Sequence, residues 1–193
     1  MVSQLKVNEI IKQSGSSISI GESGDTINLA ATGDTVNLAG SAYAAPETNT
    51  PAFSAYRGSS QSISNETYTR VSFNYEFYDT DNAFDPNTTQ RFTVPSGKAG
   101  KYHFDTMVRF SPFTGEVRVV PYKNGGDYGF QSTYIGNKTT TVTSSFDLDL
   151  SVGDYIEIYC WQNSGGSLNL SADTTDPILT TFSGFRIITW QVN

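Results

Sequence analysis

Three nine-residue units near the start of the chain constrain its fold more than any other feature. The units, 15–23, 24–32 and 33–41, each begin with glycine and carry one pair of apolar residues two positions apart. A short strand with two apolar side chains cannot bury a core by itself, and about three repeats is the lower limit for a stable solenoid. We therefore predict that several identical chains wrap around one axis and pool these side chains in a subunit interface. The six side chains are Ile18, Ile20, Ile27, Leu29, Val36 and Leu38.

The same repeats have a simpler alternative interpretation. Their Gly, Ser and Thr content and low hydrophobicity also fit a disordered linker, although the regular nine-residue spacing favours an ordered stalk. The spacing does not match the Gly-Gly-x-Gly-x-Asp pattern of calcium-binding β-roll repeats. We predict a docking segment and β-repeat stalk over residues 1–41, a linker over 42–51 and a head domain over 52–193.

Composition excludes several classes of function. The 193 residues include 12 Lys and Arg against 19 Asp and Glu, a net charge of -7, whereas binding to nucleic acid needs a basic face. No apolar run approaches the roughly 18 residues of a transmembrane helix, so we expect no membrane insertion. Cys160 is the only cysteine, so the chain cannot form an internal disulfide.

The start of the chain and its composition together bear on where it acts. Residues 1–15 lack the apolar stretch of a secretory signal peptide, which predicts synthesis in a cytoplasm. The aromatic-rich, strand-forming composition is nevertheless common in proteins that work outside cells. A virion component, which is assembled in the host cytoplasm and released by lysis, satisfies both observations.

Alternating apolar and polar residues predict an all-β head domain. Turn signals such as Asn124-Gly-Gly and Ser164-Gly-Gly separate these runs, and no convincing helix pattern occurs. Pro121 predicts an edge or a bulge in its own strand. Regular short strands with turns of this kind predict a sandwich of two sheets. The expected strands cover 71–78, 91–94, 101–110, 116–123, 128–135, 140–150, 154–161 and 178–191.

Several segments of the head domain occur in a characteristic order. They are Phe53–Arg57, Asn82–Asn87 followed by Arg91–Pro95, Gly97–Phe104, Val120–Gly125, Leu150–Tyr155 and Thr181–Ile187. Their order and spacing resemble the globular head of complement first component, subcomponent q (C1q), within the tumour-necrosis-factor-like (TNF-like) jelly rolls. The resemblance covers about residues 51–191. It implies a ten-stranded jelly roll that forms compact trimers and binds partners without catalytic residues.

A second, shorter resemblance concerns the N-terminus. Leu5–Ile10, which runs into a Ser- and Ile-containing stretch, resembles the leader of bacteriophage tail-fibre and appendage proteins. Together with the C1q-like head, it implies a trimeric phage fibre whose N-terminus docks to other virion proteins. The mammalian C1q relatives follow a collagen stalk, which is missing here, so their partners are not carried over.

The only histidine is a candidate for catalysis. His103 and Asp105 are two residues apart and therefore lie on the same face of one predicted strand. A hydrolase would also need a serine at an exposed elbow, and no Gly-x-Ser-x-Gly motif occurs in the sequence. We therefore expect His103 to be a surface or interface residue and the protein not to be an enzyme.

One cluster of acidic residues is a candidate for calcium. Asp79, Asp81 and Asp85 are closely spaced, but Ala83 and Phe84 stand where an EF-hand loop has an oxygen ligand and a glycine. Asp side chains also cap their own backbone in turns. We therefore expect turn chemistry and no metal or other cofactor, with a calcium site at these residues as the weaker alternative.

The predicted strand over 154–161 has two distinct faces. Cys160 alternates with Ile156 and Ile158, so these side chains should face the core. The opposite face then carries three aromatic residues, more than a solvated strand needs. We predict that they form part of a subunit interface, with a ligand platform as the alternative. The three residues are Tyr155, Tyr159 and Trp161.

Loops at the end of the head domain farthest from the stalk are the predicted contact surface. Consecutive antiparallel strands place successive loops at alternate ends, and loops can vary without disturbing the scaffold. Counting strands back from the C-terminus puts the loops at 111–115, 135–138 and 162–176 at the far end. The candidate receptor contacts in these loops are Phe113, Asn137, Asn163 and Asp173.

These observations lead to one preferred function and two alternatives. We predict a homotrimeric virion fibre or appendage protein that attaches to a host cell-surface glycan or protein through its head. The first alternative is a head-decoration or appendage protein that stabilises the virion. The second is a glycan depolymerase, which would usually show a long β-helix or a pair of catalytic carboxylates in a groove.

Overall fold

The described part of the chain consists of strands and connecting loops. The structure, a computed structural model, describes residues 49–171 and 179–188, which belong to one compact unit with the range Pro46–Asn193. The nine-residue repeats and most of the predicted linker lie outside the described residues, so the stalk and its six interface residues stay predictions. The described residues form thirteen strands and no helix, so they contain no helix that could cross a membrane.

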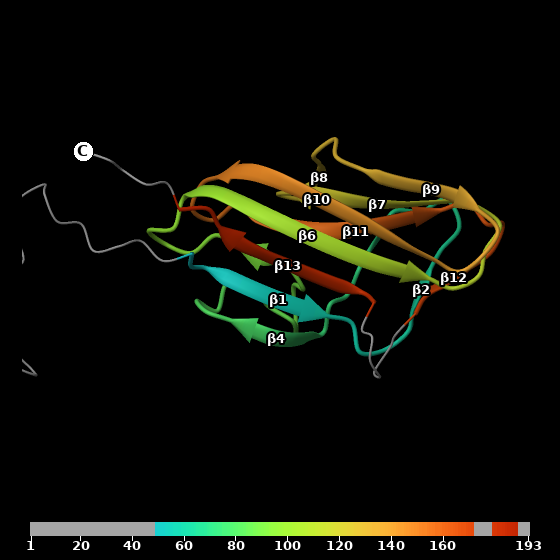
Figure 1. Cartoon of the computed structure of the whole chain (residues 1–193), viewed down its shortest axis with the longest axis horizontal. Helices are drawn as coiled ribbons and strands as arrows, with labels where there is room; N and C mark the ends of the chain where they lie inside the picture. The colour runs from blue at the N-terminus through green and yellow to red at the C-terminus, as the bar shows by residue number, and fades with distance from the viewer. Residues whose placement is uncertain (1–48, 172–178, 189–193) are drawn as a thin grey trace, which may run out of the picture. The chain divides into compact units, whose positions relative to one another are not determined.

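Seven strands form the first sheet, and all of its strand pairs are antiparallel (Figure 1). β10 (Thr140–Leu150) pairs with β6 over its whole length, and β4 pairs only with β1. The order of the other six strands is β2 (Gln61–Ile63), β12 (Leu168–Leu170), β6 (Gly100–Phe110), β13 (Thr181–Arg186), β1 (Ala52–Tyr56) and β4 (Tyr75–Asp79).

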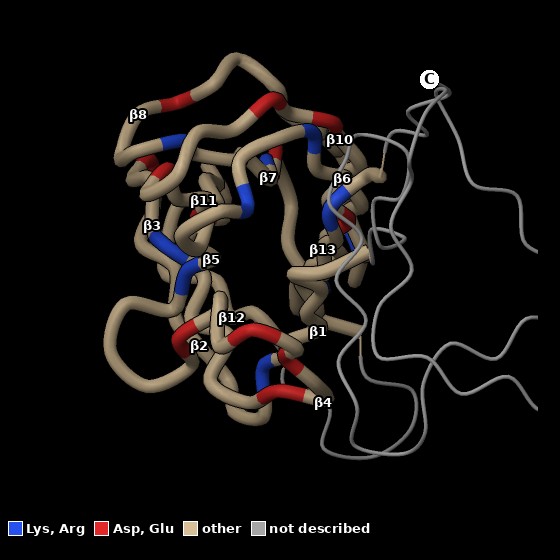
Figure 2. Tube along the Cα trace, turned by 90° about the vertical axis from the view of Figure 1, so that its left-hand side faces the viewer, with Lys and Arg blue, Asp and Glu red and all other residues tan. Residues whose placement is uncertain are grey.

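Six strands form the second sheet, which lies opposite the first as a separate layer (Figure 2). β11 and β7 pair along seven residues at its centre. The path across the sheet is β3 (Thr69–Arg70), β11 (Tyr155–Gln162), β7 (Gly115–Lys123) and β8 (Gly126–Asp127), while β5 (Phe92–Thr93) pairs with β11 and β9 (Ser132–Gly136) with β7. The two layers form the predicted all-β sandwich. Eight of the thirteen described strands have five or more residues, and the other five are short.

A single hydrophobic core fills the space between the sheets because the long strands alternate inward and outward side chains. Every second residue of β10 from Val142 to Leu150 is buried, while the residues between them are exposed. At the centre, the ring of Phe53 stacks on Phe84 and Phe92 with centroid distances of 5.1 and 5.2 Å. Full burial of one such ring contributes about 1.5–3 kcal/mol to folding, so the aromatic core fixes how the sheets pack.

The prediction for residues 71–78 is half wrong. Val71 and Phe73 are fully buried but lie outside any strand, because this segment crosses from β3 in the second sheet to β4 in the first. Strand pairing begins only at Tyr75, where the chain has reached the edge of the first sheet. Tyr75 and Phe77 are therefore exposed, although they continue the period-two alternation of the buried Val71 and Phe73.

Pro121 lies where its missing N–H costs the sheet no hydrogen bond between neighbouring strands. Its carbonyl accepts a hydrogen bond from Tyr128, so its nitrogen also points toward the β8 and β9 side of β7. On that side the β9 pairing ends at Val119 and the β8 pairing begins at Tyr122. The predicted edge character of Pro121 is thus realised as a break between two short partner strands.

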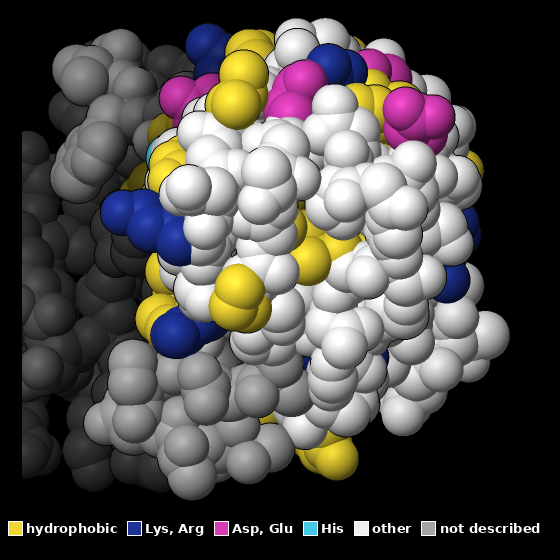
Figure 3. Space-filling view, turned by 90° about the vertical axis from the view of Figure 1, so that its right-hand side faces the viewer, with side chains coloured by type: hydrophobic (Ala, Val, Ile, Leu, Met, Phe, Trp, Pro, Cys, Tyr) yellow, Lys and Arg dark blue, Asp and Glu magenta, His cyan; other side chains and the backbone are white. Residues whose placement is uncertain are grey.

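The loops gather at two ends of the sandwich. The distal end comprises residues 64–67, 111–114, 137–139 and 163–167, and backbone hydrogen bonds join Asn163 to Glu116 and Glu66 to Gln162 there. Figure 3 looks at this end and shows mostly uncharged polar side chains and backbone, with charged groups toward its margin. The predicted placement of the loops around Phe113, Asn137 and Asn163 at one end agrees with this arrangement.

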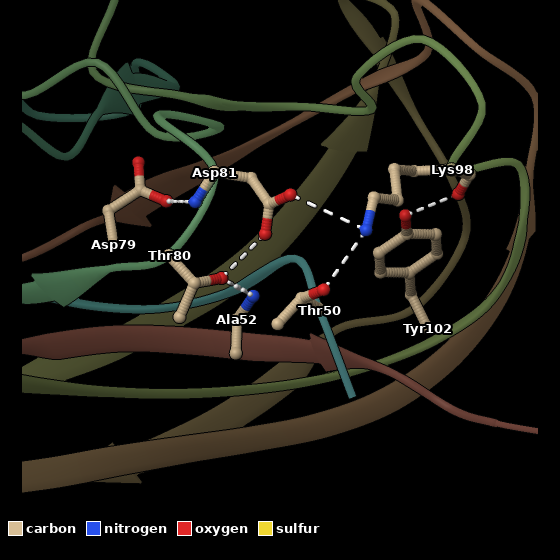
Figure 4. A network of polar contacts seen from close by, with 7 residues as sticks. All are labelled: Thr50, Ala52, Asp79, Thr80, Asp81, Lys98 and Tyr102. Carbon is tan, nitrogen blue, oxygen red and sulfur yellow. Dashed lines mark hydrogen bonds and ion pairs between the residues drawn. The ribbon is translucent and has the colours of Figure 1, made fainter. Parts of the chain in front are cut away.

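The proximal end holds the first described residues of the domain. Lys98 contacts both the Thr50 hydroxyl, at 3.0 Å, and Asp81, at 3.5 Å (Figure 4). The Thr80 hydroxyl accepts a hydrogen bond from the Ala52 amide, and Arg186 donates its backbone N–H to Pro51. These contacts fasten the chain to the domain from Thr50 onward, two residues before the predicted start of the head.

Candidate interaction surfaces

The outer surface of the first sheet carries exposed aromatic side chains along its β4 edge. Tyr75, Phe77 and Tyr78 are 50%, 56% and 53% exposed, and Phe185 on β13 is also exposed. The ring of Tyr56 on β1 contacts Tyr75 at 5.3 Å and Phe77 at 4.5 Å, so they form one apolar surface. We call these five residues the β4 face. A contiguous apolar surface of this kind at the edge of a sheet is typical of an interaction site.

Phe77 owes its exposure to a local irregularity in strand pairing. The register between β1 and β4 shifts between Ser54 and Ala55, so that Glu76 pairs with Ala55 and Tyr78 with Ser54. Phe77 is the extra residue in this bulge. Bulges bend an edge strand and re-aim its side chains, and here the result is a run of neighbouring exposed aromatic residues.

His103 also lies on the outer surface of the first sheet, between two carboxylates. Its Nδ1 is 2.6 Å from Asp147 and its Nε2 is 2.9 Å from Asp105, while the ring of Phe185 lies 5.4 Å away. The hydrogen bond to Asp147 is the main cause that raises the pKa of His103 above its usual value, and Asp105 adds to the effect. The prediction that this histidine lies at the surface is confirmed.

The surroundings of His103 contain the residue types of a catalytic triad but arrange them differently. The Ser145 hydroxyl lies 3.4 Å from Nε2, and Asp147 bonds Nδ1, which is the order of a serine hydrolase. Asp105, however, occupies the same Nε2 atom at a shorter distance. The Nε2 atom therefore faces a carboxylate at a shorter distance than the Ser145 hydroxyl, unlike the histidine of a serine hydrolase.

The outer surface of the second sheet carries five aromatic residues that contact one another or a guanidinium group. Tyr159 stacks on Tyr122 with a centroid distance of 4.0 Å, and both phenol pKa values are raised mainly by burial. Val120 lies on the same side of β7 and is fully buried although it points away from the core. We call this surface the β11 face. It comprises Tyr68, Tyr122, Tyr155, Tyr159 and Trp161.

Charged side chains brace the β11 face at both of its ends. The guanidinium of Arg91 lies 3.8 Å above the Tyr155 ring, and that of Arg118 lies 4.4 Å above Trp161. Each cation over a ring contributes about 0.5–1 kcal/mol at an exposed position. The predicted outward direction of the aromatic residues of β11 is thus observed, and Cys160 faces the core, where burial raises its pKa.

The four predicted receptor contacts of the distal loops differ in where the structure places them. Phe113 is only 6% exposed and packs against Phe110 and Tyr134, so it belongs to the core and the prediction of a surface contact is wrong. Asn163 is exposed, but its side-chain oxygen accepts the Glu116 amide at 2.6 Å and braces the loop. Asn137 is exposed in the turn between β9 and β10, and Asp173 lies outside the described residues.

The three aspartates proposed as a weak calcium site are engaged in turns. Asp79 accepts the amides of Asp81 and Phe84, and Asp81 contacts Lys98. Asp85 accepts three amides, and these hydrogen bonds lower its pKa to about 2. In residues 49–171 and 179–188 no group of three His, Cys, Asp or Glu side chains is arranged to hold a metal ion. The geometry favours the turn interpretation.

Comparisons with known proteins identify the fold. No family model matches the sequence, and no curated protein matches it. Among solved structures, the globular domain of zebrafish complement 1qA aligns with a TM-score of 0.50 at 19% identity, covering 72% of this chain and 98% of that domain. Murine APRIL aligns with a TM-score of 0.54 at 15% identity, covering 70% of this chain and 98% of its own.

A third structure comes from a bacteriophage. The PRD1 vertex protein P5 aligns with a TM-score of 0.56 at 16% identity, covering 74% of this chain and 100% of that one. The domain has the C1q/TNF-like jelly-roll fold. At these identities the likeness shows the fold alone, and it confirms the fold that the ordered sequence segments predicted.

The sequence did not identify several exposed aromatic residues as surface contacts. Tyr75 and Phe77 continue the alternation of Val71 and Phe73 within the expected strand 71–78, and no role was predicted for Tyr68. A signal was present in the run Tyr75-Glu-Phe-Tyr78, where aromatic residues at adjacent positions cannot all face one side of a regular strand. Nothing in the sequence indicated that Arg118 would lie over Trp161, because that contact depends on the register of β7 with β11.

Proposed function

We propose that this protein is a homotrimeric, non-catalytic virion component that attaches the particle to a host cell surface through its jelly-roll head. The observation that carries the proposal is the likeness to a phage vertex protein over the whole length of that protein. The unsupported apolar pairs of the repeats and the exposed aromatic residues of the β4 face add support for self-association. Residues 1–41 would then join the head to other virion proteins.

The β4 face supports subunit contact better than the three aromatic residues of β11 that the sequence favoured. Tyr155, Tyr159 and Trp161 already contact Arg91, Tyr122 and Arg118, respectively, within one chain. In contrast, Phe77 and Tyr78 expose more than half of their surface. Burying apolar area contributes about 25 cal/mol per Å², so the exposed surface gains more from a partner subunit.

Two measurements test the proposal. Light scattering on the full chain should give about three times 21.0 kDa, and a stable monomer or dimer would contradict it. Purified protein added to susceptible cells should then reduce adsorption of the parent phage, because it occupies the same receptor. A homotrimer without this competition would leave only the structural role.

A second function is favoured by the same likeness. The matched phage protein is described as a vertex protein, which is compatible with a component that stabilises the particle. This role predicts that virions lacking the protein lose infectivity on heating, while purified protein leaves adsorption unchanged. Adsorption competition therefore separates the two functions in one assay.

A further inference from the structure

The distal half of the β11 face brings together side chains from four separate segments. Trp161 of β11 is paired in register with Arg118 of β7, and Glu116 of β7 is paired with Ile135 of β9. Tyr68, which precedes β3, completes the group with its ring 6.4 Å from that of Trp161. We call these five residues the Trp161 cluster.

The polar centre of the cluster is held in place before any ligand arrives. Arg118 donates its Nε–H to Glu116, bonds the Tyr68 side chain and lies over the Trp161 ring. The bond to Glu116 is the main cause that raises the pKa of Arg118. A guanidinium with three partners loses little freedom on binding, and such preorganisation favours affinity.

Apolar surface remains exposed on both sides of this polar centre. Tyr68 is 38% exposed on one side, and Ile135 is 74% exposed on the other. The row from β9 across β7 to β11 spans about 10 Å, since neighbouring strands lie roughly 4.8 Å apart. The cluster thus offers two apolar contacts that flank fixed hydrogen-bonding groups on a flat surface.

The charges of the Trp161 cluster are balanced within it. Glu116 pairs with Arg118, and farther along the sheet Glu157 pairs with Arg70 at 3.0 Å. An anionic ligand would have to compete with these carboxylates, whereas an uncharged ligand can add hydrogen bonds to both partners. Charge complementarity therefore favours an uncharged ligand that carries hydroxyl groups.

We propose that the Trp161 cluster binds a neutral saccharide, with one pyranose ring on the exposed Tyr68 ring beside Trp161 and its hydroxyls on Arg118 and Glu116. A pyranose combines an apolar C–H face, which packs on aromatic rings, with hydroxyls around its rim. This inference rests on the proposed host attachment and names the ligand class and the surface for it. The cluster adjoins the distal end through Asn163, whose amide donates to the Glu116 carbonyl, so it lies away from the proximal chain ends.

The proximal end of β11 provides a matched control. Arg91 lies over Tyr155 as Arg118 lies over Trp161, but at the proximal end, where the Asn124 side chain accepts the Tyr155 amide and donates to Asp154. Removing either guanidinium takes away one cation over one ring, and Arg118→Ala also removes the bond to Glu116, which belongs to the proposed site. A difference between Arg118→Ala and Arg91→Ala therefore reports the location of binding and not a general loss of stability.

The test begins with the full chain on an array of neutral and sialylated oligosaccharides. We expect binding to one or more neutral glycans, a loss of at least tenfold in affinity for Tyr68→Ala and Arg118→Ala, and unchanged affinity for Arg91→Ala. Melting temperatures measured in parallel establish that each variant is folded. Binding only to sialylated glycans, no binding by the folded protein, or equal losses for Arg91→Ala and Arg118→Ala would overturn the proposal.

Phage adsorption separates this proposal from the function on which it rests. If wild-type protein and Tyr68→Ala both block adsorption, the proposed host attachment is supported and the proposed saccharide site at the Trp161 cluster is wrong. If neutral glycans bind but adsorption is not blocked, the saccharide site at the Trp161 cluster is supported and the proposed host attachment is wrong. Cells treated with periodate should lose adsorption, whereas loss only after protease treatment would indicate a protein ligand and overturn the saccharide proposal.

Discussion

The two outer faces of the sandwich each carry five aromatic residues, but the two sets differ in how far their rings are covered within the chain. On the β11 face the rings stack on one another or lie beneath guanidinium groups, and Val120 is fully covered. On the β4 face the rings of Phe77 and Tyr78 are more than half exposed, and the strand that carries them has an unpaired edge. Most rings of the β11 face are covered within a single chain, whereas the β4 face leaves more aromatic surface for a partner subunit. The number of aromatic residues is thus a weaker guide to an interface than their exposure.

The largest expected effect separates the two faces by assembly. In a fragment that begins at Pro46, Phe77→Asp should convert the proposed trimer to a monomer, because it places an unpaired charge in the proposed subunit contact, at a cost of several kcal/mol. Light scattering measures the change. Val152→Asp is the matched control, since Val152 is 53% exposed, close to the 56% of Phe77, but lies in a proximal turn. A trimer that survives Phe77→Asp would exclude the β4 face as the contact.

A smaller effect should separate the faces by stability of the single chain. In the Phe77→Asp background, Tyr159→Ala should lower the free energy of unfolding by about 2 kcal/mol, because it removes a stacked ring that covers Val120. Tyr78→Ala in the same background should stay within about 0.5 kcal/mol, as expected for an exposed side chain. Urea denaturation gives both values. Equal losses would mean that the two faces do not differ in internal packing.

Acid should destabilise the domain without acting through either face. The pKa values of Asp85 and Asp154 are lowered from 3.8 to about 2, chiefly by hydrogen bonds from the Thr89 amide and the Asn124 side chain. Their stabilising contribution is present above pH 3.8 and is lost as the pH falls toward 2. The melting temperature of the Phe77→Asp monomer should fall over this range, and Asp85→Asn should flatten the fall. An unchanged acid profile in Asp85→Asn would contradict this assignment.

The smallest expected effect concerns His103 beside the β4 face. Its pKa in the folded protein is raised, so its contribution to stability is complete below about pH 6.5 and is lost as the pH rises through the folded value. The melting temperature should therefore decline slightly from pH 6 to pH 9 in the wild type. His103→Gln should remove that slope, and a slope that persists would assign it to other groups.

Sequence reasoning succeeded where one strand alternates against a single core. The alternation in 101–110 and 140–150 gave β6 and β10 almost to the residue, and Cys160 was correctly placed inside. It failed where tertiary context decides. Phe113 lies in a loop yet fills the core beside Phe110, and Phe77 follows a buried pattern yet lies at a sheet edge.

The surface chemistry could be predicted only in part for a similar reason. Outward aromatic residues on one strand follow from period two, so Tyr159 and Trp161 could be found. The residues that cover these rings come from β7 and from the segment before β3. The register between two strands cannot be deduced from the sequence of either strand alone. The contact of Arg118 with Trp161 and the open surface of Phe77 both depend on such register.

The fastening of the chain at Thr50 has a mechanical consequence. β1 runs from the proximal toward the distal end between β13 and β4, so a pull on Thr50 against a distal tether acts along the strand axis. Hydrogen bonds from β1 to both neighbours are then loaded together in shear, whereas a pull across the strand would open them one after another. The same polypeptide should therefore resist rupture far better when tension enters through its N-terminal side, the direction in which a particle moving in a flow would drag on a bound head.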